Sequence, residues 1–237
     1  DDTPSALNVG MPNTALNGLY CRSFTIIYRC KHKGYSRMHN HLDFQNYTKM
    51  EYGHLIIPSP DEKYKKLPDI YDRLCAVIYF ASNIDSKSNR SIMSDKAHSE
   101  AMVRAALCEW VAIEDYISIA CPEYKGTWFN EYVHSNPILH MLKLLRNFNV
   151  HIDSSRLEKE LIRVMLPFYK DNQYDLEKAY ISNVSVDSLE KLHGARKYIS
   201  HLPKMVDIFN EQQREWGISG LIIKCTLDNT VNLDVLL

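Results

Sequence analysis

The sequence lacks closely spaced cysteine pairs, long apolar runs and a strong excess of either charge. Its six cysteines are scattered without a CxxC pair, whereas zinc sites and small disulfide scaffolds usually show tighter spacing. We therefore expect a reduced, cytoplasmic protein without a cofactor. No run approaches the roughly 18–20 apolar residues of a transmembrane helix, so no membrane contact is expected. Cys75 and Cys108 lie within apolar helical patterns and are predicted to be small core residues.

Several catalytic motifs are also missing. The sequence contains no GxSxG, no P-loop, no glycine-rich dinucleotide turn and no HExxH. The net charge is −1, so binding of nucleic acid would require a local basic patch. The sequence therefore gives no motif evidence for the enzyme classes that these motifs identify.

Helical periodicity dominates the chain after residue 67. Apolar residues recur at helical spacing from Pro68 onward, and Ser94 precedes some 27 residues without Gly or Pro. A third helix is expected after Ser135 or Asn136 as N-cap, with Pro137 at its first position. The predicted fold class is therefore mainly α, a helical bundle.

Three stretches have a different pattern. Residues 20–66 contain the strand-like segments CRSFTIIYRC and GHLIIP, and we expect a β-rich extension there, preceded by a flexible tail over 1–19. Residues 155–180 fit either a helix or a strand. Gly217 is expected to end a helix, and 221–237 is predicted to form short C-terminal strands, conceivably a hairpin.

The stretch LLRNFNVHI places Arg146 and His151 five residues apart near the end of the third helix. An arginine fork matches phosphate oxygens, and an imidazole exchanges protons near neutral pH, so such a pair suits cleavage of a phosphodiester without a metal. On a regular helix the two side chains would point about 140° apart. Either the helix loosens after Asn147, or two chains each supply an Arg and a His to a shared groove.

A simpler interpretation is a solvated arginine and a histidine that suits the helix dipole. The spacing alone is common, and the chain repeats it at Arg196 and His201. The two pairs differ in the next residue, because Asn147 follows Arg146 whereas Lys197 follows Arg196.

The first pair resembles the R-x4–6-H motif of the HEPN superfamily of helical ribonucleases and nucleic-acid-associated domains. In that family an Asn, Asp or His follows the arginine, and the motif ends a long apolar helix within a bundle. The resemblance covers 70–216 loosely and implies a HEPN-like domain over 67–237 that contains minor β elements. It also implies a homodimer whose two motifs form one cleft, with Arg146 stabilising phosphate charge, His151 transferring the proton and Asn147 orienting one of the groups.

The resemblance implies a metal-independent endoribonuclease of toxin–antitoxin or antiviral defence systems, with RNA as substrate and an antitoxin or regulatory partner. In some HEPN toxins a tyrosine two residues after the histidine is modified by a partner enzyme. This chain has Asp153 there, so that mode of control is not expected. The alternative function is a non-catalytic module for dimerisation or for binding RNA or a partner.

Two N-terminal clusters provide further candidates. A basic run interleaved with aromatic residues is typical of surfaces that hold single-stranded nucleic acid, although a charged edge strand would look the same. The His39-x-His41 pair, with Asp43, could begin a metal site, but no matching ligand cluster completes it, so a polar loop is favoured. The candidate RNA-binding residues are Arg22, Arg29, Lys31, Lys33 and Arg37.

Overall fold

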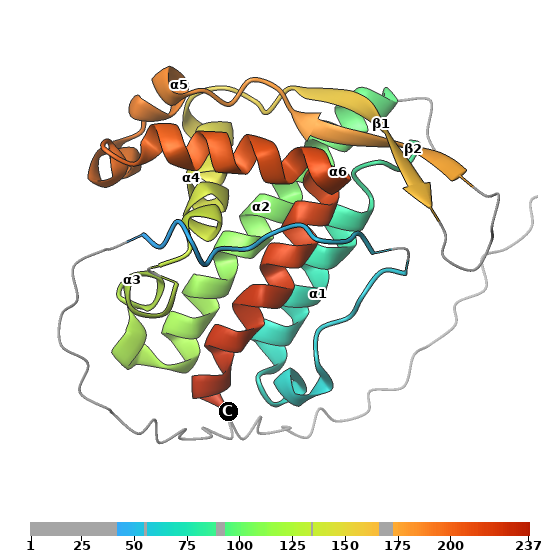
Figure 1. Cartoon of the computed structure of the whole chain (residues 1–237). Coiled ribbons are helices and arrows are strands. Elements are labelled where there is room, and N and C mark those ends of the chain that lie inside the picture. Colours follow the sequence, from blue (N-terminus) through green and yellow to red (C-terminus); the bar gives the residue numbers. More distant parts are fainter. Residues whose placement is uncertain (1–41, 55, 89–92, 134, 166–172) are drawn as a thin grey trace, which may run out of the picture.

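The computed structural model describes residues 42–54, 56–88, 93–133, 135–165 and 173–237 (Figure 1). Over these residues the protein is mainly helical with a two-stranded antiparallel sheet, which confirms the mainly α part of the predicted fold class. The α-helices are α1 (Pro68–Ser82), α2 (Asp95–Ala120), α3 (Trp128–Tyr132), α4 (Pro137–His151), α5 (Val186–Glu190) and α6 (Leu202–Leu233); the strands are β1 (Leu157–Met165) and β2 (Gln173–Ile181); the 3-10 helices are η1 (Glu62–Lys66), η2 (Pro122–Tyr124), η3 (His193–Tyr198) and η4 (Asp234–Leu236).

Side-chain caps begin α2 and α4, and the cap of α4 is one of the two predicted. The Ser94 side chain accepts a hydrogen bond from the backbone N–H of Ala97 at 3.2 Å and starts α2. The Asn136 side chain accepts one from the Ile138 N–H at 3.1 Å, and Pro137 follows at the first position of α4. These caps satisfy donors that the first helical turn leaves unpaired.

The bundle core lies between α1, α2, α4 and α6. α1 packs along α2, while α4 and α6 pack against each other and against α2. Of the 15 residues in α4, nine are buried, so this helix is held on several sides. Among the described helices, none combines the length and apolar character needed to cross a membrane.

The buried face of α2 differs from the one expected. Val103, Leu107 and Trp110 face the core, whereas Cys108 is exposed and Cys75 in α1 is only partly buried. The prediction that Cys108 is a core residue is therefore wrong, because the larger side chains one position earlier bury more apolar area. The fully buried cysteines are Cys121 and Cys225.

The predicted C-terminal strands are wrong, because 221–233 belongs to α6. Leu221, Ile222, Cys225, Asn229 and Leu233 are buried at spacings of three or four residues, which is helical periodicity. The β-branched residues suggested strands, but packing against the bundle overrides that propensity. Asp228 and Asn229, where a hairpin would have turned, lie inside the helix. Lys224 pairs with Asp228 at 2.5 Å.

Gly217 separates α6 into two arms that run in different directions (Figure 1). Its φ is +75°, in a region that L side chains rarely adopt, and Trp216 before it is also non-helical. A Cβ at Gly217 would lie 3.0 Å from the carbonyl oxygen of Ala179 in β2. The predicted helix end at Gly217 is thus a sharp bend between two helical arms.

The ambiguous region 155–180 forms the hairpin of β1 and β2, with Leu157 opposite Ile181. Side chains occupy part of the free edge of β2. Asp85 accepts from the Ala179 N–H at 2.9 Å, and Gln213 both accepts from the Ile181 N–H at 2.8 Å and donates to its carbonyl at 2.9 Å. Asp85 also accepts from Ser219 in α6, which ties the strand to the second arm. These bonds cover an edge that could otherwise pair with another chain.

The described part of the expected β-rich extension contains no strand. Residues 42–54 and 56–61 form an irregular segment followed by η1, so GHLIIP is not a strand over its described residues. The segment is fixed to the bundle by the Met50 N–H, which donates to Gln212 at 2.7 Å, and by Asn136, which donates to Thr48 at 3.0 Å. CRSFTIIYRC and the expected tail over 1–19 lie outside the described residues.

Replacing Gly217 by Ala should lower the free energy of unfolding by about 2–4 kcal/mol, since it adds backbone strain and a contact with the Ala179 carbonyl. Gly126→Ala is the matched control, because Gly126 has φ +73° and nothing within 4 Å of its Cβ position. That variant should lose about 1 kcal/mol. Chemical denaturation of both variants tests this, and equal losses would contradict the account.

Candidate functional site

α4 remains a regular helix through the whole motif. The Ile152 N–H donates to the Phe148 carbonyl at 2.9 Å, so the hydrogen-bond ladder continues past His151. Asn149 does not loosen the helix; its side chain donates to the Leu145 carbonyl at 2.9 Å and accepts from the Ser155 N–H at 2.7 Å. The predicted loosened end is therefore wrong, because Asn149 stabilises the helix terminus.

Arg146 is partly buried and has only a neighbour's amide as partner. Its guanidinium donates from Nη1 to Oδ1 of Asn147 at 3.0 Å, and its Nε is enclosed without an acceptor. Within the part of the chain that the structure describes, no carboxylate pairs with Arg146. An enclosed, unsatisfied donor costs about 1–3 kcal/mol, more for a charged group. Such a guanidinium is well suited to an incoming anion.

His151 is the last residue of α4 and its side chain is exposed. Residues four apart share a helix face, so Lys143, Asn147 and His151 form one ridge along α4, while Arg146 points about 140° from His151. The Arg146–Asn147 hydrogen bond draws the guanidinium toward this ridge. Even so, the regular helix keeps Arg146 and His151 apart, which leaves the groove shared by two chains as the arrangement in which they could meet.

η3 lies beside the same ridge. The Cβ position of Gly194 is 3.8 Å from Nδ2 of Asn147, so the backbone of η3 passes close to the motif. The second Arg/His pair therefore lies in and just after an element that packs beside the first. The His201 ring is 5.6 Å from the Phe44 ring, and Arg196 is exposed.

A buried pair of polar side chains connects α4 with η3. His140 in α4 is 1% exposed, and its Nδ1 is hydrogen-bonded to the hydroxyl of Tyr198 in η3. Burial first, and then the charge of Glu114, raise the pKa of Tyr198, so the hydroxyl keeps its proton in its hydrogen bond with His140. The bond fixes η3 against α4.

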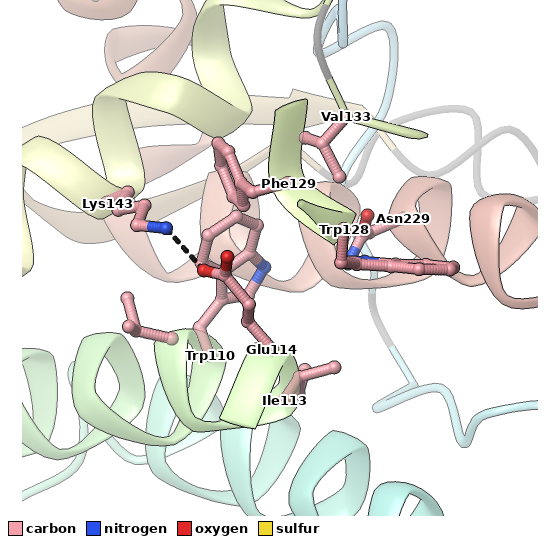
Figure 2. A pocket seen from close by; sticks show the side chains of 9 residues that line it. Trp110, Ile113, Glu114, Trp128, Phe129, Val133, Lys143 and Asn229 are labelled. Carbon is pink, nitrogen blue, oxygen red and sulfur yellow. Dashed lines mark hydrogen bonds and ion pairs between the residues drawn. The ribbon is translucent and has the colours of Figure 1, made fainter. Parts of the chain in front are cut away.

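Lys143, one turn before Asn147, pairs with Glu114 of α2 (Figure 2). Its ammonium also lies 4.3 Å from the centre of the Phe129 ring. Glu114 therefore supports the motif helix across the bundle. Glu109 instead pairs with Arg73 of α1 at 2.7 Å.

The pocket around Lys143 and Glu114 is too small for a substrate. Its free volume is about 10 Å³, near the minimum for one water molecule. The indole Nε1 of Trp110, which lines it, is buried without an acceptor. The pocket is thus a packing cluster behind the motif, lined by Trp110, Val111, Ile113, Glu114, Trp128, Phe129, Val133, Lys143 and Asn229.

A larger polar hollow lies elsewhere, between the segment 45–52, the start of α4 and the second arm of α6. Its volume is about 410 Å³. Lys224 and Asp228 line it and pair with each other, so their charges compensate. This hollow therefore shows no preference for an anion.

The N-terminal candidates lie outside the described residues. These are the basic residues Arg22, Arg29, Lys31, Lys33 and Arg37, together with His39 and His41. Asp43 is described, and its carboxylate accepts from the backbone of Gln45 and Asn46 as in a local turn. Among the described side chains, no group of three could hold a metal ion.

Replacing Tyr198 by Phe should lower the free energy of unfolding by about 1–3 kcal/mol, because it leaves the buried His140 nitrogen without its partner. It should also speed hydrogen exchange of the backbone amides in η3. Tyr174→Phe is the control, since Tyr174 is 47% exposed. If both variants unfold at the same denaturant concentration, the bond does not fix η3.

Comparisons with known proteins add no relative. No protein-family model, no curated protein and no solved structure matches this chain. Its function must therefore be argued from the side chains at the end of α4.

Proposed function

We propose that this protein is a homodimeric, metal-independent endoribonuclease. The observation that carries the proposal is the partly buried guanidinium of Arg146, which has an enclosed Nε and, over the described residues, no carboxylate partner. A phosphate would supply the missing acceptor and the missing negative charge. HEPN-like membership of the chain is part of this proposal and rests on the motif Arg146–Asn147 with His151.

The division of roles follows from the side-chain chemistry. Arg146 binds the scissile phosphate and stabilises the charge that develops on it. His151 removes the proton of the ribose 2′-hydroxyl or protonates the leaving 5′-oxygen. Asn147 holds the guanidinium through its Oδ1 at 3.0 Å. The bond from phosphorus to the 5′-oxygen breaks as the bond to the 2′-oxygen forms, which gives a 2′,3′-cyclic phosphate and a 5′-hydroxyl.

A second protomer completes the site in this proposal. Within one regular α4, Arg146 and His151 diverge by about 140°. When two α4 ends meet, the arginine of one chain can face the histidine of the other across a shared groove. The exposed position of His151, at the very end of its helix, suits such a meeting.

The test is cleavage of a mixed RNA substrate in EDTA by the full chain. We expect cyclic-phosphate ends, and His151→Ala or Arg146→Ala should reduce the rate at least about 100-fold without changing the folded spectrum. His201→Ala is the matched control, because Arg196 and His201 repeat the spacing, and its rate should stay within about twofold of the parent.

Equal loss in His151→Ala and His201→Ala would show that the spacing around Arg146 carries no special role. Undiminished cleavage by His151→Ala would also overturn the proposal. Absence of cleavage by the parent chain on every RNA offered would favour the alternative, a binding module without catalysis.

A further inference from the structure

The faces of η3 can be assigned from its geometry. Residues three apart share a face of a 3-10 helix. Ala195 and Tyr198 form the buried face, with 0% and 4% exposure. Gly194 lies on the second face, beside Asn147 of α4. His193 and Arg196 therefore share the third face, and both are exposed.

Lys197 supports this orientation independently. It shares the second face with Gly194 and is exposed at the surface. Partial desolvation, and then repulsion from the nearby Lys143, lower its pKa. Lys143 and Asn147 are four apart on the same ridge of α4. Gly194 and Lys197 of η3 thus lie near Asn147 and Lys143 of α4. The 3-10 helix η3 therefore runs along the ridge that ends in His151.

Basic side chains are exposed on the third face of η3 and directly before it. From Lys191 to Lys197 the chain has two lysines, one arginine and one histidine, and no Asp or Glu. Lys191, His193 and Arg196 are exposed, and over the described residues none of their side chains has a hydrogen bond or ion pair. Lys143 differs, because Glu114 neutralises it. In a chain of net charge −1, such a concentration is a local anion-attracting surface.

We propose that Lys191, His193 and Arg196 form a binding surface for the phosphates of single-stranded RNA that flank the phosphate held by Arg146. The inference rests on the proposed ribonuclease function and states where the RNA next to the cleaved phosphate would bind. The surface is continuous with the motif, because Arg146 donates to Asn147 and Asn147 lies beside Gly194. It differs from the basic run over 22–37 that the sequence suggested.

The experiment measures binding of a labelled single-stranded RNA by fluorescence anisotropy, over a series of salt concentrations. The full-length His151→Ala chain serves as the parent, so that the RNA stays intact. Arg196→Gln is compared with Lys125→Gln, which removes the same charge from the exposed loop between α2 and α3, away from the α4 end (Figure 1).

Arg196→Gln should weaken binding about 5- to 10-fold near 0.1 M salt and reduce the slope of log K against log salt by about 0.7, as for one lost phosphate contact. Lys125→Gln should change the affinity less than about twofold. Adding Lys191→Gln to Arg196→Gln should weaken binding further.

The outcomes separate this proposal from the proposed function. If the parent binds RNA and Arg196→Gln behaves like Lys125→Gln, the surface is wrong and the ribonuclease proposal stands. If Arg196→Gln weakens binding but the wild-type chain cleaves no RNA, the surface is right and the ribonuclease is wrong. If the parent binds no RNA, both proposals are wrong.

Discussion

The bend at Gly217 determines how α6 encloses the rest of the protein. Its positive φ lets the first arm follow η3 and the second arm pack with α1 and α2. The bend also lies directly against β2, where the carbonyl of Ala179 leaves no room for a side chain. Gln213 of the first arm bonds the same strand, as does Asp85, which follows α1 and accepts from Ser219 of the second arm. The hairpin, the bundle and η3 are therefore positioned by one backbone conformation.

α4 is rigid because this framework surrounds it. Nine of its residues are buried, Lys143 pairs with Glu114, and His140 bonds to Tyr198. A helix held in this way does not unwind at its end to bring Arg146 toward His151. In the proposed dimer, the same packing would hold each motif in place as one half of a site between two chains. It also places η3, with its exposed cations, along the ridge.

The sequence predicted what depends on local chemistry. The helix start at Pro68 and the start of α4 at Asn136 and Pro137 follow from proline and a cap, and these predictions are confirmed. The strands predicted over 221–237 were wrong. The β-branched residues of 221–233 are helical because they are buried against distant elements. The motif of Arg146, Asn147 and His151 could be recognised in the sequence, but the conformation of the helix end that carries it could not be predicted. Asn149 reads as a helix breaker, and only the structure shows its bonds to Leu145 and Ser155. The proximity of η3 is likewise a tertiary fact without a sequence signal.

The most direct test of the central claim is to co-express two differently tagged chains, one Arg146→Ala and one His151→Ala, and purify the mixed dimer through both tags. If Arg146 of one protomer acts with His151 of the other, the mixed dimer keeps one intact pair. We expect it to cleave RNA at up to about half the wild-type rate, while each variant alone stays at least about 100-fold slower. A mixed dimer as inactive as either variant would contradict a site shared between two chains.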